Sequence, residues 1–300
     1  KSVYASPSLE AWLSKWGEKK IDNKTGKIQS SMEMETILKE LEGKPHVVRR
    51  LEERDGLSSP SAPFTTSTLQ QDAGSRLGYS LKQTMTIAQK LYEGNVKKKG
   101  VEKGFITYMR TDSVTLSQEA LRDIRETILK EFGEEYALEK PRFYKNKSKM
   151  AQEAHEAIRP TDMFLTPEKA RSFLDGSELK LYSLIWRRTI ACQMQSAKLK
   201  KTTVTITAGT AEFTAEGQVI IFPGYLKTGM EMAKETLLPK LSEGMELPLA
   251  SVLLSIPEEP GEEATEPQKR DYLQKVNAFK VEPKISGLLP EQHFTKAPAR

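Results

Sequence analysis

Two residues of the sequence, Tyr108 and Arg110, have the types and spacing that could carry out chemistry on a phosphate. They lie in the segment 104–113 (GFITYMRTDS), which the pattern predicts to be extended and to lead into a helix. Residues two apart share one face of an extended chain, so we expect both side chains to point the same way. A tyrosine hydroxyl has a pKa of about 10 and needs a neighbouring cation to become a nucleophile, and a guanidinium also binds phosphate oxygens. The same spacing fits an ordinary half-buried tyrosine beside an arginine.

One of the three histidines, His155, lies in a second candidate segment, 151–160 (AQEAHEAIRP). The pattern predicts a helix that ends at Pro160 and places His155 and Arg159 on one face. A histidine beside a phosphate can donate a hydrogen bond or transfer a proton. The segment also fits a solvent-exposed polar turn. The zinc-protease pattern His-Glu-x-x-His is not completed, and we expect no metal site in this chain.

The charge distribution favours a polyanionic partner. The net charge is +5, and residues 61–191 carry all of this surplus, with 22 basic and 17 acidic residues. A basic surface that binds a polyanion would have such a distribution, although a solvated lysine-rich surface accounts for it equally well. The basic residues nearest Tyr108 in the sequence are Lys97, Lys98, Lys99 and Lys103 before it, and Arg142, Lys145, Lys147 and Lys149 after it.

The composition excludes several classes of protein. No apolar run reaches the roughly 18 residues of a membrane span, and no signal peptide is present, so we expect a soluble protein without a membrane partner. The single cysteine, Cys192, excludes an internal disulfide framework and a thiolate zinc cluster, which favours the cytoplasm. The chain begins at Lys1 without a methionine, which indicates a piece of a longer protein.

Helix signals fill the middle of the chain. Two helices joined by a tight turn are predicted: one capped by Thr66 or Ser67, running to about Leu77 and ended by Gly78, and one capped by Ser80, running from Leu81 to Glu93 and ended by Gly94. Further helices are predicted to begin at Ser117, at Thr166 and after Ser177. The first two fit a DNA-inserting helix-turn-helix, but two packed helices account for them better.

Strand signals fill the two flanks. Residues 198–222 predict a hairpin around Ala208-Gly209, then a second turn at Glu216-Gly217 and another strand. Segments 46–54, 9–16 and 247–254 are further strand candidates, although 9–16 also fits a helix, and 31–42 predicts a helix. Segment 56–63 is a predicted domain boundary and 257–267 a predicted surface insertion. We expect an α+β multidomain protein, in which residues 1–60 and 192–290 form one β-rich domain and the helical domain 61–191 is inserted.

Five strings in this order resemble the central part of bacterial type IA DNA topoisomerases: SAPFTTSTLQQDAGSRLGYSLKQTMTIAQKLYEG, GFITYMRTDSVTLSQEAL, AQEAHEAIRPTD, LIWRRTIACQMQ and QHFTKAPAR. The resemblance is strong over about residues 60–195 and weaker in the flanks. It implies that the β-rich halves form the arch and hinge of the type IA core, and that the helical domain carries the nucleophile. Residues 291–300 would then begin the linker to a DNA-gripping domain that follows.

The resemblance also implies roles for single residues. Tyr108 would attack one DNA strand and form a 5′-phosphotyrosine bond, Arg110 would contact the scissile phosphate, and His155 would lie close to the active site. Arg159 and Asp112 are carried over as DNA contacts. The lysines of the 95–103 insertion, Lys97, Lys98, Lys99 and Lys103, are further candidates for DNA binding.

The activity of the family implies what the whole enzyme would do. The whole enzyme would be an ATP-independent isomerase that relaxes negatively supercoiled DNA by single-strand cleavage, strand passage and religation, in the bacterial cytoplasm at the nucleoid. Its Mg²⁺ would be bound by a preceding domain with an Asp-x-Asp cluster, a pattern that does not occur in this chain. We therefore expect no cofactor in the fragment, which would be inactive in relaxation without the other domains of the same protein.

Two other classes of function stay open. Tyrosine recombinases and type IB topoisomerases also combine tyrosine, arginine and histidine, but their tyrosine follows the basic residues and forms a 3′ linkage, whereas Tyr108 precedes His155. A non-enzymatic single-stranded DNA-binding module would use the basic surface alone, with Tyr108 as a structural residue.

Overall fold

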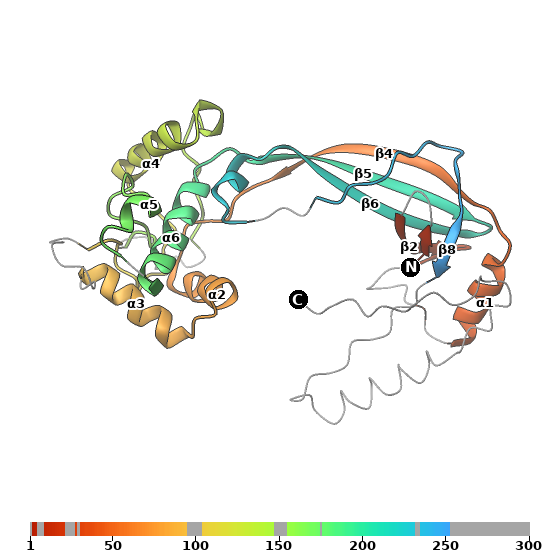
Figure 1. Cartoon of the computed structure of the whole chain (residues 1–300), viewed down its shortest axis with the longest axis horizontal. Coiled ribbons are helices and arrows are strands. Elements are labelled where there is room, and N and C mark those ends of the chain that lie inside the picture. Colours follow the sequence, from red (N-terminus) through yellow and green to blue (C-terminus); the bar gives the residue numbers. More distant parts are fainter. Residues whose placement is uncertain are drawn as a thin grey trace, which may run out of the picture. The chain divides into compact units, whose positions relative to one another are not determined.

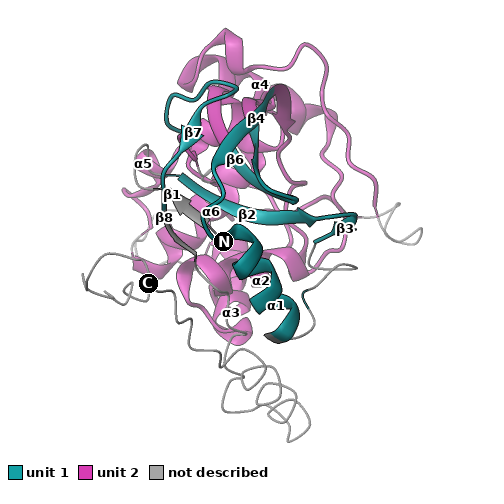
Figure 2. Cartoon of the chain, turned by 90° about the vertical axis from the view of Figure 1, so that its right-hand side faces the viewer, with its two compact units in different colours: residues 1–52, 203–216, 238–300 teal, residues 53–202, 217–237 magenta. Residues whose placement is uncertain are grey.

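The computed structural model describes residues 2–4, 9–21, 28, 31–94, 104–146, 155–174, 176–231 and 235–252. The chain divides into two compact units, coloured separately in Figure 2. Unit 1 comprises Lys1–Glu52, Thr203–Glu216 and Leu238–Arg300, and unit 2 comprises Glu53–Thr202 and Gly217–Leu237. The expected helical block, residues 61–191, lies within unit 2. Unit 2 also takes in parts of three long strands.

The strands of the described residues form one sheet in the order β7-β4-β5-β6-β2-β1-β8, with β3 paired to β2. β2 pairs antiparallel with β1, β3 and β6, and a bulge interrupts its register with β6 between Leu13 and Lys15. The bounds are β1 Ser2–Tyr4, β2 Leu9–Trp16, β3 Lys19–Lys20, β4 His46–Ser58, β5 Ala197–Ala208, β6 Ala211–Phe222, β7 Glu246–Leu247 and β8 Leu249–Val252.

The sheet agrees with the sequence expectation in part. Segment 9–16 is a strand and not a helix, and Gly209, at a φ of 58°, turns the hairpin between β5 and β6. The second turn expected at Glu216-Gly217 was wrong. Gly217 takes a buried place in the alternation that begins at Ala211 within β6, so the strand continues through it. β4 also extends to Ser58, into the stretch expected to be a boundary.

A proline divides the last predicted strand. The expectation for 247–254 was one strand, but β7 ends at Leu247 and β8 begins at Leu249. Pro248 between them has no N–H to donate to a strand ladder, which accounts for the break. Residues 253 and 254 lie outside the described part of the chain.

In unit 1 the helix α1 (Ser31–Leu41) packs on the sheet. Its Ile37 and Leu41 are buried in one cluster with strand residues such as Phe213. The Glu40 carboxylate fixes the helix further, because it accepts hydrogen bonds from Trp16 Nε1 at 2.6 Å and Thr210 Oγ1 at 3.1 Å.

Unit 2 contains all the described α-helices except α1 (Figure 1). Their bounds are α2 Thr66–Leu77, α3 Leu81–Glu93, α4 Gln118–Glu131, η1 Glu134–Tyr136, α5 Pro167–Ala170, α6 Gly176–Ala191 and η3 Gly224–Thr228. α6 contacts α2, α3, α4, α5 and η3, and its Leu181, Tyr182 and Ile185 are accordingly buried. The two predicted helices are confirmed, and glycines in the left-handed conformation end both of them. Ser80 caps α3 as expected, but the cap of α2 is Thr65 and not Thr66 or Ser67, because the Thr65 side chain accepts the hydrogen bond from Thr68 N–H. None of the described helices is long and apolar enough to cross a membrane.

A buried arginine joins α6 to the chain before α2. The Arg188 guanidinium lies 4.8 Å from the centre of the Phe64 ring, donates to Ala62 O at 2.6 Å and pairs with Asp72 Oδ2 at 3.3 Å. Its side chain is 11% exposed, so its charge is used inside the unit.

Candidate active site

The segment that carries Tyr108 has no regular secondary structure between Gly104 and the start of α4, but within it residues 108–113 alternate strictly between an exposed and a buried side. Tyr108, Arg110 and Asp112 are exposed, and the three residues between and after them, Met109, Thr111 and Ser113, are buried. Tyr108 itself is 40% exposed. The expectation that Tyr108 and Arg110 share one side of an extended chain agrees with this alternation.

The start of the segment is pressed against the end of α3. A Cβ at Gly104 would lie 1.9 Å from Tyr92 O, so only glycine allows the two backbones to come this close. Phe105 N–H donates to Leu91 O at 2.7 Å, which satisfies one of the carbonyls left unpaired at the end of a helix. The Phe105 ring meets Tyr182 edge-on at 6.2 Å, in the core of unit 2.

The middle of the segment is bonded to residues 157–160. Thr107 N–H donates to Arg159 O at 2.9 Å, and the Thr107 hydroxyl donates to Ala157 O at 2.7 Å and accepts from Arg159 N–H at 3.0 Å. The helix expected over this stretch was wrong for the described residues 155–160. They are extended, because Pro160 disfavours a helical residue before it and their backbone pairs with Phe64 and Ile106 instead. Residues 151–154 lie outside the described part of the chain.

The end of the segment is held by the first residue of α2. Thr66 N–H donates to Thr111 O at 2.8 Å. The Thr66 hydroxyl donates to Met109 O at 2.8 Å and accepts from Thr111 N–H at 2.9 Å. Three separate attachments, at α3, at residues 157–159 and at α2, therefore fix the backbone on both sides of Tyr108.

Three rings meet on the exposed side. Tyr108 contacts Tyr92 edge-on at 5.3 Å and lies 6.1 Å from the His155 ring, measured between ring centres. The structure thus brings together the tyrosine and the histidine that the sequence analysis singled out from segments 47 positions apart. Tyr92 was missed. Its signal was its place beside buried Leu91 in the last turn of α3, on the exposed side of an amphipathic helix.

A carboxylate next to His155 organises the surrounding backbone. Glu156 Oε1 accepts from Ser117 N–H at 2.6 Å, at the start of α4, and Glu156 Oε2 accepts from Arg159 Nε at 3.1 Å and Nη2 at 2.7 Å. Burial raises the pKa of the Glu156 carboxyl, but the hydrogen bonds from Ser117 and Arg159 and the charge of Arg159 outweigh it, so the pKa lies below its usual value.

The remaining predicted residues have different surroundings. The Arg159 side chain is 14% exposed and also donates to Pro160 O, so its guanidinium is engaged within the unit; its contact with DNA stays a prediction, as does that of Asp112. Lys97, Lys98, Lys99 and Lys103 lie outside the described residues. Arg142 donates to Cys192 O and Met194 O, both at 2.9 Å. At least one of the basic residues near Tyr108 in the sequence therefore forms hydrogen bonds within the unit.

Within the part of the chain that the structure describes, neither the Cys192 thiol nor a group of metal-ligating side chains offers a second site. Burial raises the pKa of the Cys192 thiol to about 12, so it carries no thiolate at neutral pH. Among the described residues, no group of three or more His, Cys, Asp and Glu side chains is placed to hold a metal ion.

A sequence model of the DNA topoisomerase family matches residues 8–274, which include every residue of the site. The chain belongs to this topoisomerase family. It is 42% identical over 237 residues to DNA topoisomerase 1 of Helicobacter pylori strain J99, covering 79% of this chain and 32% of the relative. It is 43% identical over 239 residues to DNA topoisomerase 1 of Campylobacter jejuni, covering 80% of this chain and 34% of the relative. This topoisomerase chain therefore spans about a third of the length of these relatives.

A solved topoisomerase has the same fold. The structure of full-length topoisomerase I from Thermotoga maritima matches with a TM-score of 0.64 and 36% identity, over 80% of this chain and 37% of the other. The resemblance to bacterial topoisomerases and the α+β core expected from it are confirmed.

Proposed function

We propose that this chain is the nucleophile-bearing part of a type IA DNA topoisomerase, an isomerase that relaxes negatively supercoiled DNA by passing a strand through a transient single-strand break. One observation carries the proposal: the Tyr108 ring is exposed beside His155 on a segment whose backbone is fixed at three places. A nucleophile that must attack and later release the same phosphorus atom needs such a fixed position.

The chemistry needs no outside energy. The Tyr108 phenolic oxygen, after losing its proton, attacks the phosphorus of a phosphodiester. The bond from phosphorus to the 3′ oxygen breaks, and that oxygen takes up a proton as a free 3′ hydroxyl. The 5′ phosphate stays joined to the tyrosine as a new diester, so the reverse attack restores the strand without ATP.

The neighbouring residues have separate roles. Arg110, on the same exposed side, would bind the non-bridging oxygens of the attacked phosphate, where negative charge builds up. His155 would donate a hydrogen bond or transfer a proton at the same phosphate. Asp112, Arg159 and the lysines of the 95–103 insertion would contact the DNA nearby.

The rest of the enzyme would lie outside this chain. The Mg²⁺ of the whole enzyme would be bound by another domain, since the described residues offer no grouped metal ligands. This chain alone would bind single-stranded DNA weakly without relaxing supercoils. The whole protein would act in the bacterial cytoplasm, at the nucleoid.

The test is a covalent adduct. In a full-length protein that contains this chain, Tyr108→Phe should abolish the DNA adduct, and mass spectrometry of the wild type should find the 5′ phosphate on Tyr108. Tyr79→Phe, which removes a hydroxyl elsewhere in unit 2, should leave the adduct in place. An adduct with a 3′ phosphate, or one on another side chain, would overturn the proposal.

A further inference from the structure

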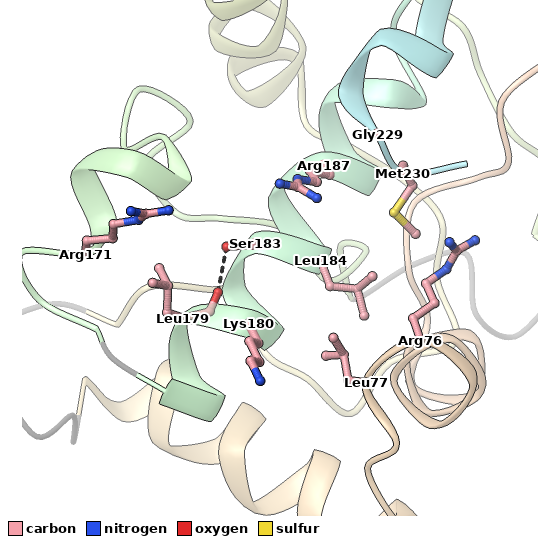
Figure 3. A pocket seen from close by; sticks show the side chains of 10 residues that line it. All are labelled: Arg76, Leu77, Arg171, Leu179, Lys180, Ser183, Leu184, Arg187, Gly229 and Met230. Carbon is pink, nitrogen blue, oxygen red and sulfur yellow. Dashed lines mark hydrogen bonds between the residues drawn. The ribbon is translucent and has the colours of Figure 1, made fainter. Parts of the chain in front are cut away.

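The backbone attachments around Tyr108 leave the orientation of its ring undecided. They fix the segment at α3, at residues 157–159 and at α2, but the side chain of Tyr108 can still rotate about its own bonds on the exposed side. The cavity of about 400 Å³ shown in Figure 3 does not enclose this ring, because its lining comes from the end of α2, from α6 and from residues that follow α5 and η3. The orientation of the ring therefore depends on the side chains next to it at the surface.

Tyr92 makes the better defined of the two ring contacts of Tyr108. The centres of the Tyr92 and Tyr108 rings lie 5.3 Å apart and their planes are inclined by 66°, which is the edge-to-face geometry that aromatic pairs prefer. The His155 ring is farther away, at 6.1 Å, and is tilted by 44°. An edge-to-face contact favours its own geometry over others by roughly 3- to 10-fold, which is enough to bias the side-chain conformation of Tyr108.

The backbone of Tyr92 is itself held firmly. Tyr92 lies in the last turn of α3, directly after the fully buried Leu91, whose carbonyl accepts the hydrogen bond from Phe105 N–H. The Tyr92 carbonyl lies so close to Gly104 that a Cβ there would be 1.9 Å from it. His155, by contrast, is exposed on a stretch without regular secondary structure. Tyr92 therefore ties the Tyr108 ring to a helix of the packed unit.

We propose that Tyr92 is a positioning residue for the reaction of Tyr108. Its ring holds the Tyr108 ring in the orientation from which the phenolic oxygen attacks, and keeps it there while the strand is joined to that oxygen. The proposal rests on the proposed function, because that function makes Tyr108 the nucleophile. The ring of Tyr92 is what acts and its hydroxyl is not needed, because an edge-to-face contact is made by the ring alone.

The experiment uses a full-length protein that contains this chain. It measures the single-turnover rate of cleavage of a single-stranded oligonucleotide at saturating enzyme, and the Kd for the same oligonucleotide by fluorescence anisotropy. Tyr92→Leu removes the ring and should slow cleavage about 3- to 10-fold, with a Kd within about two-fold of the wild type. Tyr92→Phe keeps the ring and should cleave within about two-fold of the wild-type rate. A slower rate at an unchanged Kd identifies a residue that acts on the reacting group and not on DNA binding.

Two controls complete the experiment. Tyr92→Gln is a second ringless variant, with a side chain that suits an exposed helix position, and it should slow cleavage as much as Tyr92→Leu. Phe143→Leu removes a 72% exposed ring elsewhere in unit 2 and should leave the rate unchanged. Circular dichroism verifies that the variants fold.

Four results would overturn the role of Tyr92. These are wild-type cleavage by the ringless variants, a Tyr92→Phe variant as slow as they are, an equal slowing by Phe143→Leu, and a Kd that weakens as much as the rate falls, as for a ring that stacks on a DNA base. The wild-type adduct separates this test from that of the proposed function. An adduct on Tyr108 together with unslowed ringless variants refutes the role of Tyr92 alone.

Discussion

Replacing Gly104 by alanine should destabilise unit 2 and loosen the segment that carries Tyr108. The added Cβ would lie 1.9 Å from Tyr92 O, a backbone atom, whereas ordinary contacts begin at 3.4 Å. The two backbones would have to separate by roughly an ångström or more, which breaks the 2.7 Å hydrogen bond from Phe105 N–H to Leu91 O. Overpacking costs about 1–3 kcal/mol and the lost hydrogen bond about 1 kcal/mol, so we expect the free energy of unfolding to fall by about 2–4 kcal/mol.

Urea unfolding followed by circular dichroism measures this loss, as a lower midpoint at an unchanged slope. Gly74 supplies the matched control. It lies within α2, where an added Cβ would meet its nearest neighbour, Tyr79 O, at an ordinary 3.6 Å. Gly74→Ala should therefore raise the stability by up to about 1 kcal/mol, through the better helix propensity of alanine. If Gly104→Ala proved as stable as the wild type, the close approach of the segment to α3 would be refuted.

Three other substitutions test the remaining supports of the site. Thr66→Ala should lower the free energy of unfolding by about 1–3 kcal/mol, because the hydroxyl forms hydrogen bonds with two backbone groups of the Tyr108 segment. Thr66→Ser keeps that hydroxyl, so its loss of stability, measured by urea unfolding, should be less than half as large. Arg188→Met should lower the free energy of unfolding by about 2–4 kcal/mol, because the buried guanidinium donates to a carbonyl and lies over a phenyl ring. Arg187→Met, at an exposed position, should change that free energy by no more than about 0.5 kcal/mol. Thermal or urea unfolding measures both. The pKa of the Glu156 carboxyl is lowered in the folded state, so its stabilisation is present above about pH 4.5 and is lost as the pH falls through the folded pKa. Glu156→Gln should therefore flatten the decline of stability below about pH 4.5.

Each of these expectations has a clear contrary result. Equal losses for the serine and alanine variants of Thr66 would mean that the methyl group matters and the hydrogen bonds do not. Equal losses for Arg187 and Arg188 would contradict the difference in their burial. An unchanged acid decline in Glu156→Gln would show that other carboxylates set the pH dependence.

Local signals predicted the helices well. Ser80 at the start of α3 and the glycines at the ends of α2 and α3 act within one turn, so neighbouring residues position those boundaries. The start of α2 was expected one or two residues late, because Thr65, Thr66 and Ser67 all carry a hydroxyl that could cap it. The alternation around Tyr108 was equally local. It predicted the exposed side that Tyr108 and Arg110 share, because side chains alternate in any extended chain.

The errors arose where distant residues decide the conformation. The sequence 151–160 has a helical pattern, but residues 157–160 pair with Phe64, Ile106 and Thr107, and a single sequence does not show those pairings. Gly217 was expected to form a turn because glycine is a common turn residue, yet the alternation of β6 continues through it. Tyr92 was overlooked because its contact with Tyr108 depends on how closely Gly104 lets two backbones approach.

The three attachments of the Tyr108 segment have a mechanical consequence. In the proposed reaction a broken strand stays tethered to the tyrosine, and any tension in that strand enters the protein at a single phenolic oxygen. From there the backbone passes the pull to α3 through Phe105, to residues 157–159 through Thr107 and to α2 through Thr66. Because the load is divided among three hydrogen-bonded anchors in one packed unit, that unit can bear the tethered strand as a rigid body and keep the tyrosine in register for rejoining the ends.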